Sequence, residues 1–267
     1  MTLINKDLYV KWLKLPSLSD ANKALARSAS VNGSADLLNL DLSKPANLLD
    51  NITYQTYIKQ SLNIPFSHAL ALDPHARCIC GFLLAEDPGH PLSCSKMEKI
   101  GRHDGLVDAA RNVLAQAGYI HINEPHLDNG NRTDIKVSHP LLGGMLNFDM
   151  SVVRAYLPSR SKESAEETLF AAHAKEAEKC TKHAKACEQR GESFLPFVFD
   201  SMGACTSTLR RITSHIADTA TSVGRRFCPT ARQIRQSLLI ALHKGNAAIV
   251  DKCLSMANIR APKPQRR

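Results

Sequence analysis

The chain has 267 residues, 43% of them hydrophobic, which is enough to build a packed core in one large domain or two small ones. No apolar stretch approaches the roughly 20 residues that cross a bilayer, and Asn5, Lys6 and Asp7 interrupt the first segment, unlike a secretory signal. These features argue against membrane and secreted proteins, and they predict a soluble, intracellular protein with no membrane partner.

The net charge of +9 is concentrated at one end of the chain. Residues 201–267 contain 12 Lys or Arg and 2 Asp, a net charge of +10, so the first 200 residues sum to −1. Such a segment can bind the phosphates of a nucleic acid, and we expect four arginines to make these contacts: Arg225, Arg226, Arg232 and Arg235. The equally favoured alternative is a solvated tail.

Residues 1–65 are predicted to form helices joined by polar loops. An apolar stripe of Tyr9, Trp12 and Leu13 indicates a helix that ends before Pro16, and a second helical pattern runs from Ile52 to Leu62. Residues 28–45 are rich in Ser, Asn, Asp and Gly, which is typical of a loop or linker. No chemistry is predicted for this region.

Residues 66–98 carry a cysteine and histidine cluster, Cys78-x-Cys80 followed by His90-x3-Cys94. Two close pairs of such ligands separated by a loop suit tetrahedral Zn²⁺, and clustering with a histidine in an intracellular chain favours metal over disulfides. The alternative is a pair of incidental buried cysteines. The sequence predicts a closed structural zinc site, because four protein ligands leave no open position for catalysis.

From Lys99 onward the pattern predicts helices and strands in turn. A helix from Lys99 to Gly118 precedes three strands, which are followed by a long helix, a fourth strand and two further helices. We expect these elements at Tyr119–Asn123, Thr133–Val137, Leu146–Val153, Ser161–Arg190, Phe194–Asp200, Thr206–Thr221 and Pro229–His243. The sequence therefore predicts an α/β fold with a mixed sheet of about four strands flanked by helices, a preceding zinc knuckle and a basic helical tail over residues 221–267.

Two aspartates lie in consecutive predicted strands, Asp134 and Asp149. A carboxylate in an apolar strand is costly unless it is paired or bound to metal, and two at the ends of adjacent strands can hold a hard cation such as Mg²⁺. Buried salt bridges are the equally favoured alternative. Glu124, at the end of the preceding strand, is a candidate third carboxylate or an ordinary surface residue.

The long predicted helix carries Lys175, Lys179 and Lys182 on one face, at i, i+4 and i+7. An ammonium near the carboxylates could orient or activate an attacking water and offset phosphate charge, whereas neighbouring glutamates also fit a solvated, salt-bridged helix. Arg102 and His103, at the start of an earlier helix, could reach a phosphate or simply cap that helix. Cys180, His183 and Cys187 share a helix face and are predicted to pack toward the core.

These residues occur in an ordered series of short motifs: Cys78-Ile79-Cys80-Gly81, Gly89-His90-Pro91-Leu92-Ser93-Cys94, Arg102-His103-Asp104, Glu124-Pro125, Arg132-Thr133-Asp134, Phe148-Asp149-Met150-Ser151-Val152 and Lys179-Cys180-Thr181-Lys182-His183. The series resembles the C-terminal restriction-like endonuclease of non-LTR retrotransposon polyproteins. That domain is similar to the PD-(D/E)XK nucleases and follows a Cys-Cys-His-Cys zinc knuckle. The resemblance covers about residues 55–220 and rests on the order of the motifs.

The resemblance implies that Asp134 and Asp149 bind Mg²⁺ or Mn²⁺ and that Lys179 or Lys182 supplies the lysine. In such elements the nuclease nicks target DNA, and the freed 3′ hydroxyl primes reverse transcription. The implied partners are DNA, element RNA and a polymerase or parent polyprotein, and the implied location is the nucleus. Residues 99–220 would form the nuclease domain.

Two positions depart from the family pattern. Thr133 stands where proline is usual, and Ser151 occupies the lysine position of the simple D-x-K pattern, so activity would depend on a lysine from the helix. No polymerase domain is visible, so we expect a detached or truncated C-terminal piece or a domesticated copy, with residues 1–65 as an upstream remnant or linker. The alternatives are a non-catalytic zinc-containing nucleic-acid-binding module and a helical scaffold that binds proteins.

Overall fold

Four strands form one mixed sheet in the computed structural model, which describes residues 6–31, 37, 40, 43–66, 75–138, 144–222, 224 and 228–257. Their order is β1-β2-β3-β4; the first two neighbouring pairs are antiparallel, and β3 and β4 are parallel. The strands are β1 (Ile120–Asn123), β2 (Ile135–Ser138), β3 (Met145–Val153) and β4 (Ser193–Asp200). The prediction of a mixed sheet of about four strands flanked by helices is confirmed.

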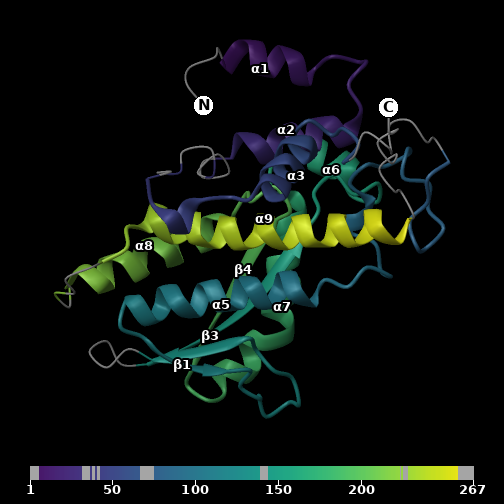
Figure 1. The fold of residues 1–267 in the computed structure, drawn as a ribbon. Helices are drawn as coiled ribbons and strands as arrows, with labels where there is room; N and C mark the ends of the chain where they lie inside the picture. Colours follow the sequence, from purple (N-terminus) through teal and green to yellow (C-terminus); the bar gives the residue numbers. More distant parts are fainter. Residues whose placement is uncertain are drawn as a thin grey trace, which may run out of the picture.

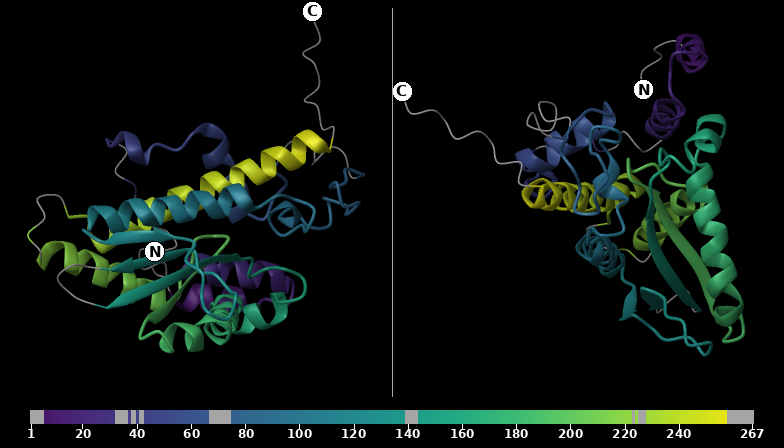
Figure 2. Two further views of the ribbon diagram at one scale, coloured as in Figure 1. Left: turned by 90° about the horizontal axis from the view of Figure 1, so that it is seen from below. Right: turned by 90° about the vertical axis from the view of Figure 1, so that its right-hand side faces the viewer.

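Helices cover both faces of this sheet (Figures 1 and 2). α7 (Phe170–Glu188) packs on β3 and β4, and the right-hand view of Figure 2 shows it on one side of the sheet. α5 (Ile100–Gln116) and α8 (Ser207–Ser222) lie on the other side. Behind them, α9 (Ala231–Met256) packs against α5, α8 and α3 (Asn51–Ser61) and so adds a further layer.

The N-terminal region contributes to the main core. α1 (Lys6–Leu13) lies at the periphery (Figure 1), whereas α2 (Asp20–Ser30) and α3 supply the buried side chains of Ala24, Leu25 and Tyr57 to the cluster around the sheet. A short 3₁₀ helix, η2 (Pro45–Asn47), precedes α3. The predicted loop at residues 28–45 overlaps the end of α2, and much of it lies outside the described residues.

The prediction of a single helix at Ser161–Arg190 was wrong, because the structure has two helices there, α6 (Ser161–Glu166) and α7. Leu169 adopts the left-handed conformation with φ of 66°, which interrupts the helical backbone. The cause is tertiary packing: α6 lies against α2, and Arg27 Nε donates a hydrogen bond of 2.6 Å to the carbonyl oxygen of Ala165.

The helix predicted to end at His243 continues as α9 to Met256. Gly245 does not stop it, because this glycine serves close helix packing: a Cβ there would lie 2.8 Å from the Cα of Arg102 on α5. The C-terminal part of α9 packs against the cysteine and histidine segment (residues 75–98), which we call the zinc segment. There, Ile249 and Val250 share a small hydrophobic cluster with Leu84, Leu92 and Met97. The described part of residues 221–267 is therefore largely helical, and α9 buries one side against the rest of the protein.

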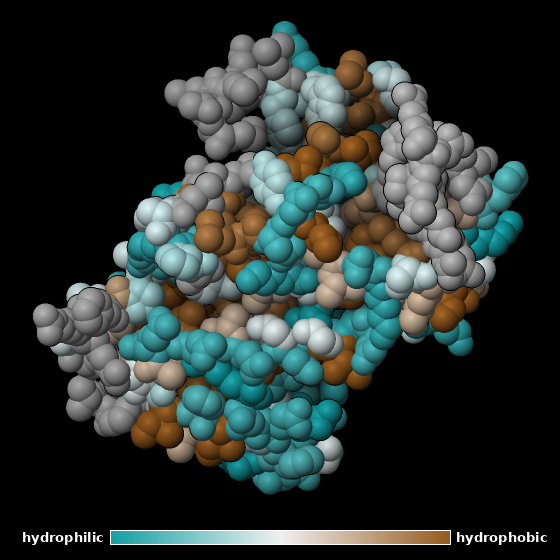
Figure 3. Space-filling view, in the orientation of Figure 1, coloured by the Kyte–Doolittle hydropathy of each residue, from teal (hydrophilic) through white to brown (hydrophobic). Residues whose placement is uncertain are grey.

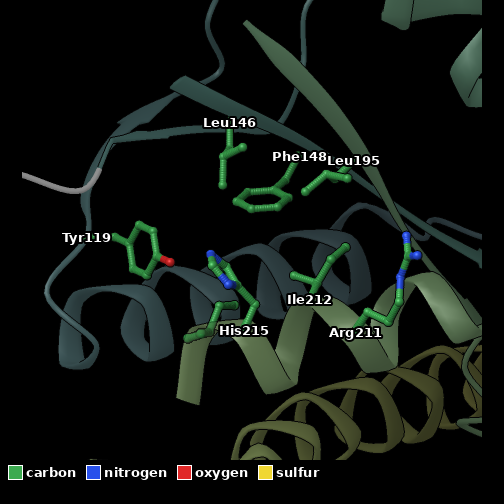
Figure 4. A pocket seen from close by; sticks show the side chains of 8 residues that line it. Tyr119, Leu146, Phe148, Leu195, Arg211, Ile212 and His215 are labelled. Carbon is green, nitrogen blue, oxygen red and sulfur yellow. The ribbon is translucent and has the colours of Figure 1, made fainter. Parts of the chain in front are cut away.

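The surface and the interior next to the sheet differ in polarity. The part of the surface that covers α5 is mainly hydrophilic, whereas hydrophobic patches lie near β1 (Figure 3), where Ile120 and Ile122 are exposed. Between the sheet and α8 lies an apolar pocket of about 170 Å³, where Phe148 and Leu195 face Ile212 (Figure 4). Among the described helices, none combines the length and the apolar character needed to span a membrane.

Candidate functional site

A tight hairpin and the 3₁₀ helix η3 (His90–Leu92) build the cysteine and histidine cluster. In the hairpin, Cys78 N donates to the carbonyl oxygen of Phe82 at 2.9 Å, and Gly81 N donates to that of Cys78 at 2.8 Å. Gly81 has φ of 90°, which an L side chain rarely adopts, so glycine permits the turn. After η3, Cys94 N donates to the carbonyl oxygen of His90 at 2.9 Å, which holds these two residues together.

The four predicted zinc ligands converge. The ligand atoms of Cys78, Cys80, His90 and Cys94 all lie within 4.8 Å of one another. The sulfurs of Cys78 and Cys94 are 3.6 Å apart, and Cys80 Sγ lies 3.1 Å from His90 Nε2. A tetrahedral zinc ion with Zn–S bonds of about 2.3 Å would hold two sulfurs about 3.8 Å apart. The cluster fits this geometry and could hold a metal such as zinc.

The protonation of the thiols depends on their surroundings. Burial raises the pKa of Cys78 to about 12. For Cys94 burial acts in the same direction, but hydrogen bonding from the backbone N–H of Lys96 and from the neighbouring thiols outweighs it and lowers the pKa. A bound cation would favour the thiolate form of both residues. A fifth thiol, Cys253 of α9, lies beside the cluster with its sulfur 3.9 Å from that of Cys78.

Asp134 lies directly before β2 and is fixed against β3. Its backbone N–H donates to the carbonyl oxygen of Phe148 at 2.9 Å, and its Oδ2 accepts from Met150 N at 2.5 Å. On the α5 side, Oδ1 lies 3.1 Å from His103 Nε2. Burial acts to raise the pKa of Asp134, but the hydrogen bonds from His103 and Met150 outweigh it and hold this pKa below its usual value. An ionised carboxylate is thus held beside Asp149.

Asp149 lies in β3 and is 5% exposed. Its Oδ2 forms an ion pair with Nζ of Lys179, which reaches over from α7. Burial raises the pKa of Asp149, and the charge of Asp134 raises it further, so the pKa lies above its usual value although Lys179 lowers it. Because two close carboxylates repel each other, a divalent cation beside them would favour the ionised form of both.

His183 is a residue of this cluster that the sequence did not assign to it. It is fully buried on α7, one turn beyond Lys179, and its Nε2 lies 3.9 Å from Asp149 Oδ2. Among the described residues, neither ring nitrogen has a hydrogen-bond partner. Burial lowers the pKa of His183, which favours neutral imidazole. The signal in the sequence was the i, i+4 spacing of Lys179 and His183, which places both on one helix face.

A polar surface pocket of about 290 Å³ adjoins Asp134 on the α5 side. Asp104 and Asp108 of α5 line it together with Glu124, so four carboxylates surround it. The Glu124 side chain is exposed and pairs with Arg132 at 3.1 Å. The structure therefore places the predicted third carboxylate at the same pocket as Asp134, while its carboxylate contacts Arg132.

Other predicted site residues lie apart from the carboxylates. Lys175 pairs with Glu178 on the outside of α7 at 2.5 Å, and Lys182 is exposed. Arg102 is buried and donates from Nη1 to Asn246 Oδ1 at 3.0 Å. Of the four C-terminal arginines, Arg232 is exposed near the start of α9, Arg235 is half-buried, and Arg225 and Arg226 lie outside the described residues.

The geometry brings two carboxylates, one ammonium and two imidazoles together between α5, the sheet and α7. Such a set can hold a hard cation and can position or deprotonate a water molecule. No protein-family model matches the chain, and no curated protein matches it. The resemblance to retrotransposon endonucleases therefore stays a prediction.

Proposed function

We propose that the protein is a divalent-metal-dependent DNA endonuclease whose centre consists of Asp134, Asp149 and Lys179. The observation that supports this most strongly is the ion pair between Lys179 and Asp149. Beside it lies the carboxylate of Asp134, which accepts a hydrogen bond from the backbone N–H of Met150, the residue after Asp149. A metal nuclease needs carboxylates and a cationic group at one place. Here they come from the residue before β2, from β3 and from α7.

The two carboxylates fit Mg²⁺ or Mn²⁺, because Mg²⁺ commonly takes one or two protein carboxylates and completes its shell with water and phosphate oxygens. When bound, such a cation lowers the pKa of a water molecule and stabilises charge on the phosphate under attack. Asp134 and Asp149 would hold it. Lys179 would orient the attacking water or offset phosphate charge, which supplies the lysine that Ser151 does not.

Two histidines support these carboxylates. His103 contacts Asp134 from α5, and its pKa is raised chiefly by that hydrogen bond. His183 closes the site from α7 and excludes water behind Asp149, since its ring is fully buried and packs against Phe194 with ring centroids 5.2 Å apart. In this proposal His103 positions Asp134, and His183 packs beside Asp149.

The biological setting follows from the resemblance. The nuclease would nick target DNA so that the freed 3′ hydroxyl primes reverse transcription, with element RNA and a polymerase as partners in the nucleus. The zinc site is structural in this proposal, and the C-terminal arginines Arg232 and Arg235, with Arg225 and Arg226, would add contacts to the DNA backbone.

The lysine pair on α7 gives a sharp test of this function. On supercoiled plasmid with Mg²⁺, we expect Lys179→Ala to lower the nicking rate by about 10²- to 10³-fold, because one positioned group that stabilises developing charge contributes that much. Lys182→Ala is the matched control on the same helix, and its rate should stay within about threefold of wild type. Single-turnover nicking rates measure both.

Two results would contradict this assignment in different ways. Equal loss in the two lysine variants would mean that charge on α7, rather than contact with Asp149, is what matters. A folded, zinc-loaded wild type that binds DNA but nicks it with neither Mg²⁺ nor Mn²⁺ would favour the non-catalytic nucleic-acid-binding module.

A further inference from the structure

A second polar pocket, of about 210 Å³, opens where the zinc segment meets the sheet. Since a water molecule takes about 30 Å³ in the liquid, this pocket has room for a phosphate group with part of its hydration. None of the described residues that line it is acidic. Four of them carry positive charge: Lys99, Arg102, Arg154 and Arg160.

Arg154 forms the frame of this pocket. It makes a two-pronged ion pair with Asp87, which lies in the turn between two of the zinc ligands, and its guanidinium lies over the ring of Tyr156 at 4.2 Å. Gly89 allows the close approach, because a Cβ there would lie 2.6 Å from Arg154 Nη2. Asp87 neutralises Arg154, so this pair locks the zinc segment onto the end of β3.

The other three cations have no carboxylate partner within the described part of the chain. Lys99 Nζ donates to the carbonyl oxygen of Ser93 at 3.1 Å, and Arg102 is held by Asn246. Burial lowers the pKa of Arg102 to about 10, and burial together with the charge of Arg102 lowers the pKa of Lys99. Of these three, Arg102 is buried, whereas Lys99 and Arg160 are half-buried. A buried cation without a counter-charge is costly, so an anion in the pocket would relieve this cost for Arg102.

The pocket lies close to the carboxylate centre. Val152 of β3 lines it, three residues beyond Asp149, which corresponds to about 10 Å along a strand. From the other side, Glu178 is the neighbour of Lys179 on α7, and its pKa is lowered chiefly by the hydrogen bond from Lys175 and also by the charge of Arg160. One DNA duplex can therefore span the pocket and the centre.

We propose that this pocket binds a backbone phosphate of DNA and thereby sets where the duplex lies relative to the cleavage centre. The zinc segment then acts as a wall of a phosphate site, joined to the sheet through Asp87 and Arg154. The choice of DNA as the ligand rests on the proposed function, whereas the anion pocket itself rests on the contacts given above.

The test compares two double variants that remove the same charge. Lys99→Gln with Arg160→Gln changes the pocket, and Lys96→Gln with Lys162→Gln changes two exposed lysines nearby that do not line it. Binding of a labelled duplex is measured in Ca²⁺, so that neither cleavage nor removal of zinc by a chelator interferes. Zinc content and thermal unfolding confirm that both variants are folded.

We expect the pocket variant to lose about tenfold in affinity at 0.15 M salt and to reduce the slope of log K against log salt by about one, since one lost phosphate contact removes about 0.9. The control should lose about twofold. Equal losses, or none in the pocket variant, would overturn the proposal.

A titration with inorganic phosphate separates the two sources of the anion. If free phosphate bound the pocket and the pocket variant kept full DNA affinity, the site would serve a small anion and the proposal would be wrong. The outcomes also distinguish the phosphate pocket from the proposed catalytic centre. If wild type failed to nick DNA but only the pocket variant lost affinity, the catalytic proposal would be wrong and the phosphate pocket would be supported. If wild type nicked DNA but the pocket variant kept full affinity, the phosphate pocket would be wrong and the catalytic proposal would be supported.

Discussion

Replacing Asp149 by Asn is expected to lower the rate of plasmid nicking at least about 10³-fold, while DNA affinity stays near that of wild type. Metal activation of water contributes several kcal/mol to the chemical step, and a 10³-fold loss corresponds to about 4 kcal/mol. Asp134→Asn should have a similar effect on the rate, because its carboxylate is held beside Asp149. Single-turnover nicking and duplex binding, measured on the same preparations, check this.

The same substitution should leave the fold at least as stable as wild type. The pKa of Asp149 lies above its unfolded value, chiefly because of burial. Its contribution to stability is therefore fully present at low pH and is lost as the pH rises through the folded-state pKa. At pH 7 the ionised group costs stability, and Asn removes that cost, while Lys179, which is 15% exposed, can turn toward solvent.

Asp134→Asn should behave differently, because the pKa of Asp134 is held below its usual value and its ionised form stabilises the fold at neutral pH. We expect a lower midpoint of thermal unfolding for this variant. Asp128→Asn, an exposed aspartate, is the control and should change neither nicking nor stability. A clear loss of stability in Asp149→Asn with nicking retained would show that Asp149 is a structural ion-pair residue.

The second large effect concerns zinc. Purified protein should carry about one zinc per chain, and Cys94→Ser should reduce this to near zero, because apparent binding free energies of structural zinc are about 10–16 kcal/mol and depend on the full ligand set. Residues 75–98 should then become sensitive to protease, whereas the main core, a separate hydrophobic cluster, should persist. Metal analysis and limited proteolysis measure the two effects.

Cys253→Ala is the matched control for this experiment. Cys253 is buried like Cys94, and its sulfur also lies near that of Cys78, but it is not one of the four converging ligands. Zinc content should stay at about one per chain in this variant. Zinc-free wild type, freshly purified and reduced, would contradict the zinc site altogether, and equal loss in both variants would contradict the choice of ligands.

The features that the sequence predicted well depend on local patterns. The strands around Ile135 and Phe148 follow from alternating apolar residues between turn signals, and they appear in the sheet as expected. The zinc set follows from the spacing of Cys78, Cys80, His90 and Cys94, since a hairpin and one short helix bring these residues together within 17 positions of the chain.

The features that it missed depend on contacts between distant segments. The spacing of Lys179 and Lys182 allowed either lysine to reach the carboxylates; the packing of α7 on β3 brings Lys179 to Asp149 and leaves Lys182 exposed. The length of α9 could not be predicted either, because Gly245 resembles a helix stop until Arg102 of α5 is placed against it.

The anion pocket could not be predicted from local patterns in the sequence either. Arg102 was expected to reach a phosphate or to cap its helix, and no spacing pattern groups it with Arg160, 58 positions later. Both line one pocket together with Arg154, whose ion pair with Asp87 joins the zinc segment to the end of β3. A tertiary contact of this kind leaves no periodic signal in the chain.

The proposed metal nuclease is tested best by the nicking of supercoiled plasmid by zinc-loaded wild type and Asp149→Asn, assayed side by side while Mg²⁺ is titrated in. We expect a wild-type rate that rises with Mg²⁺ and saturates, no product when Ca²⁺ replaces Mg²⁺, and no product from the variant at any Mg²⁺ concentration. Equal nicking by the two proteins, or none by wild type at any Mg²⁺ concentration, would contradict it.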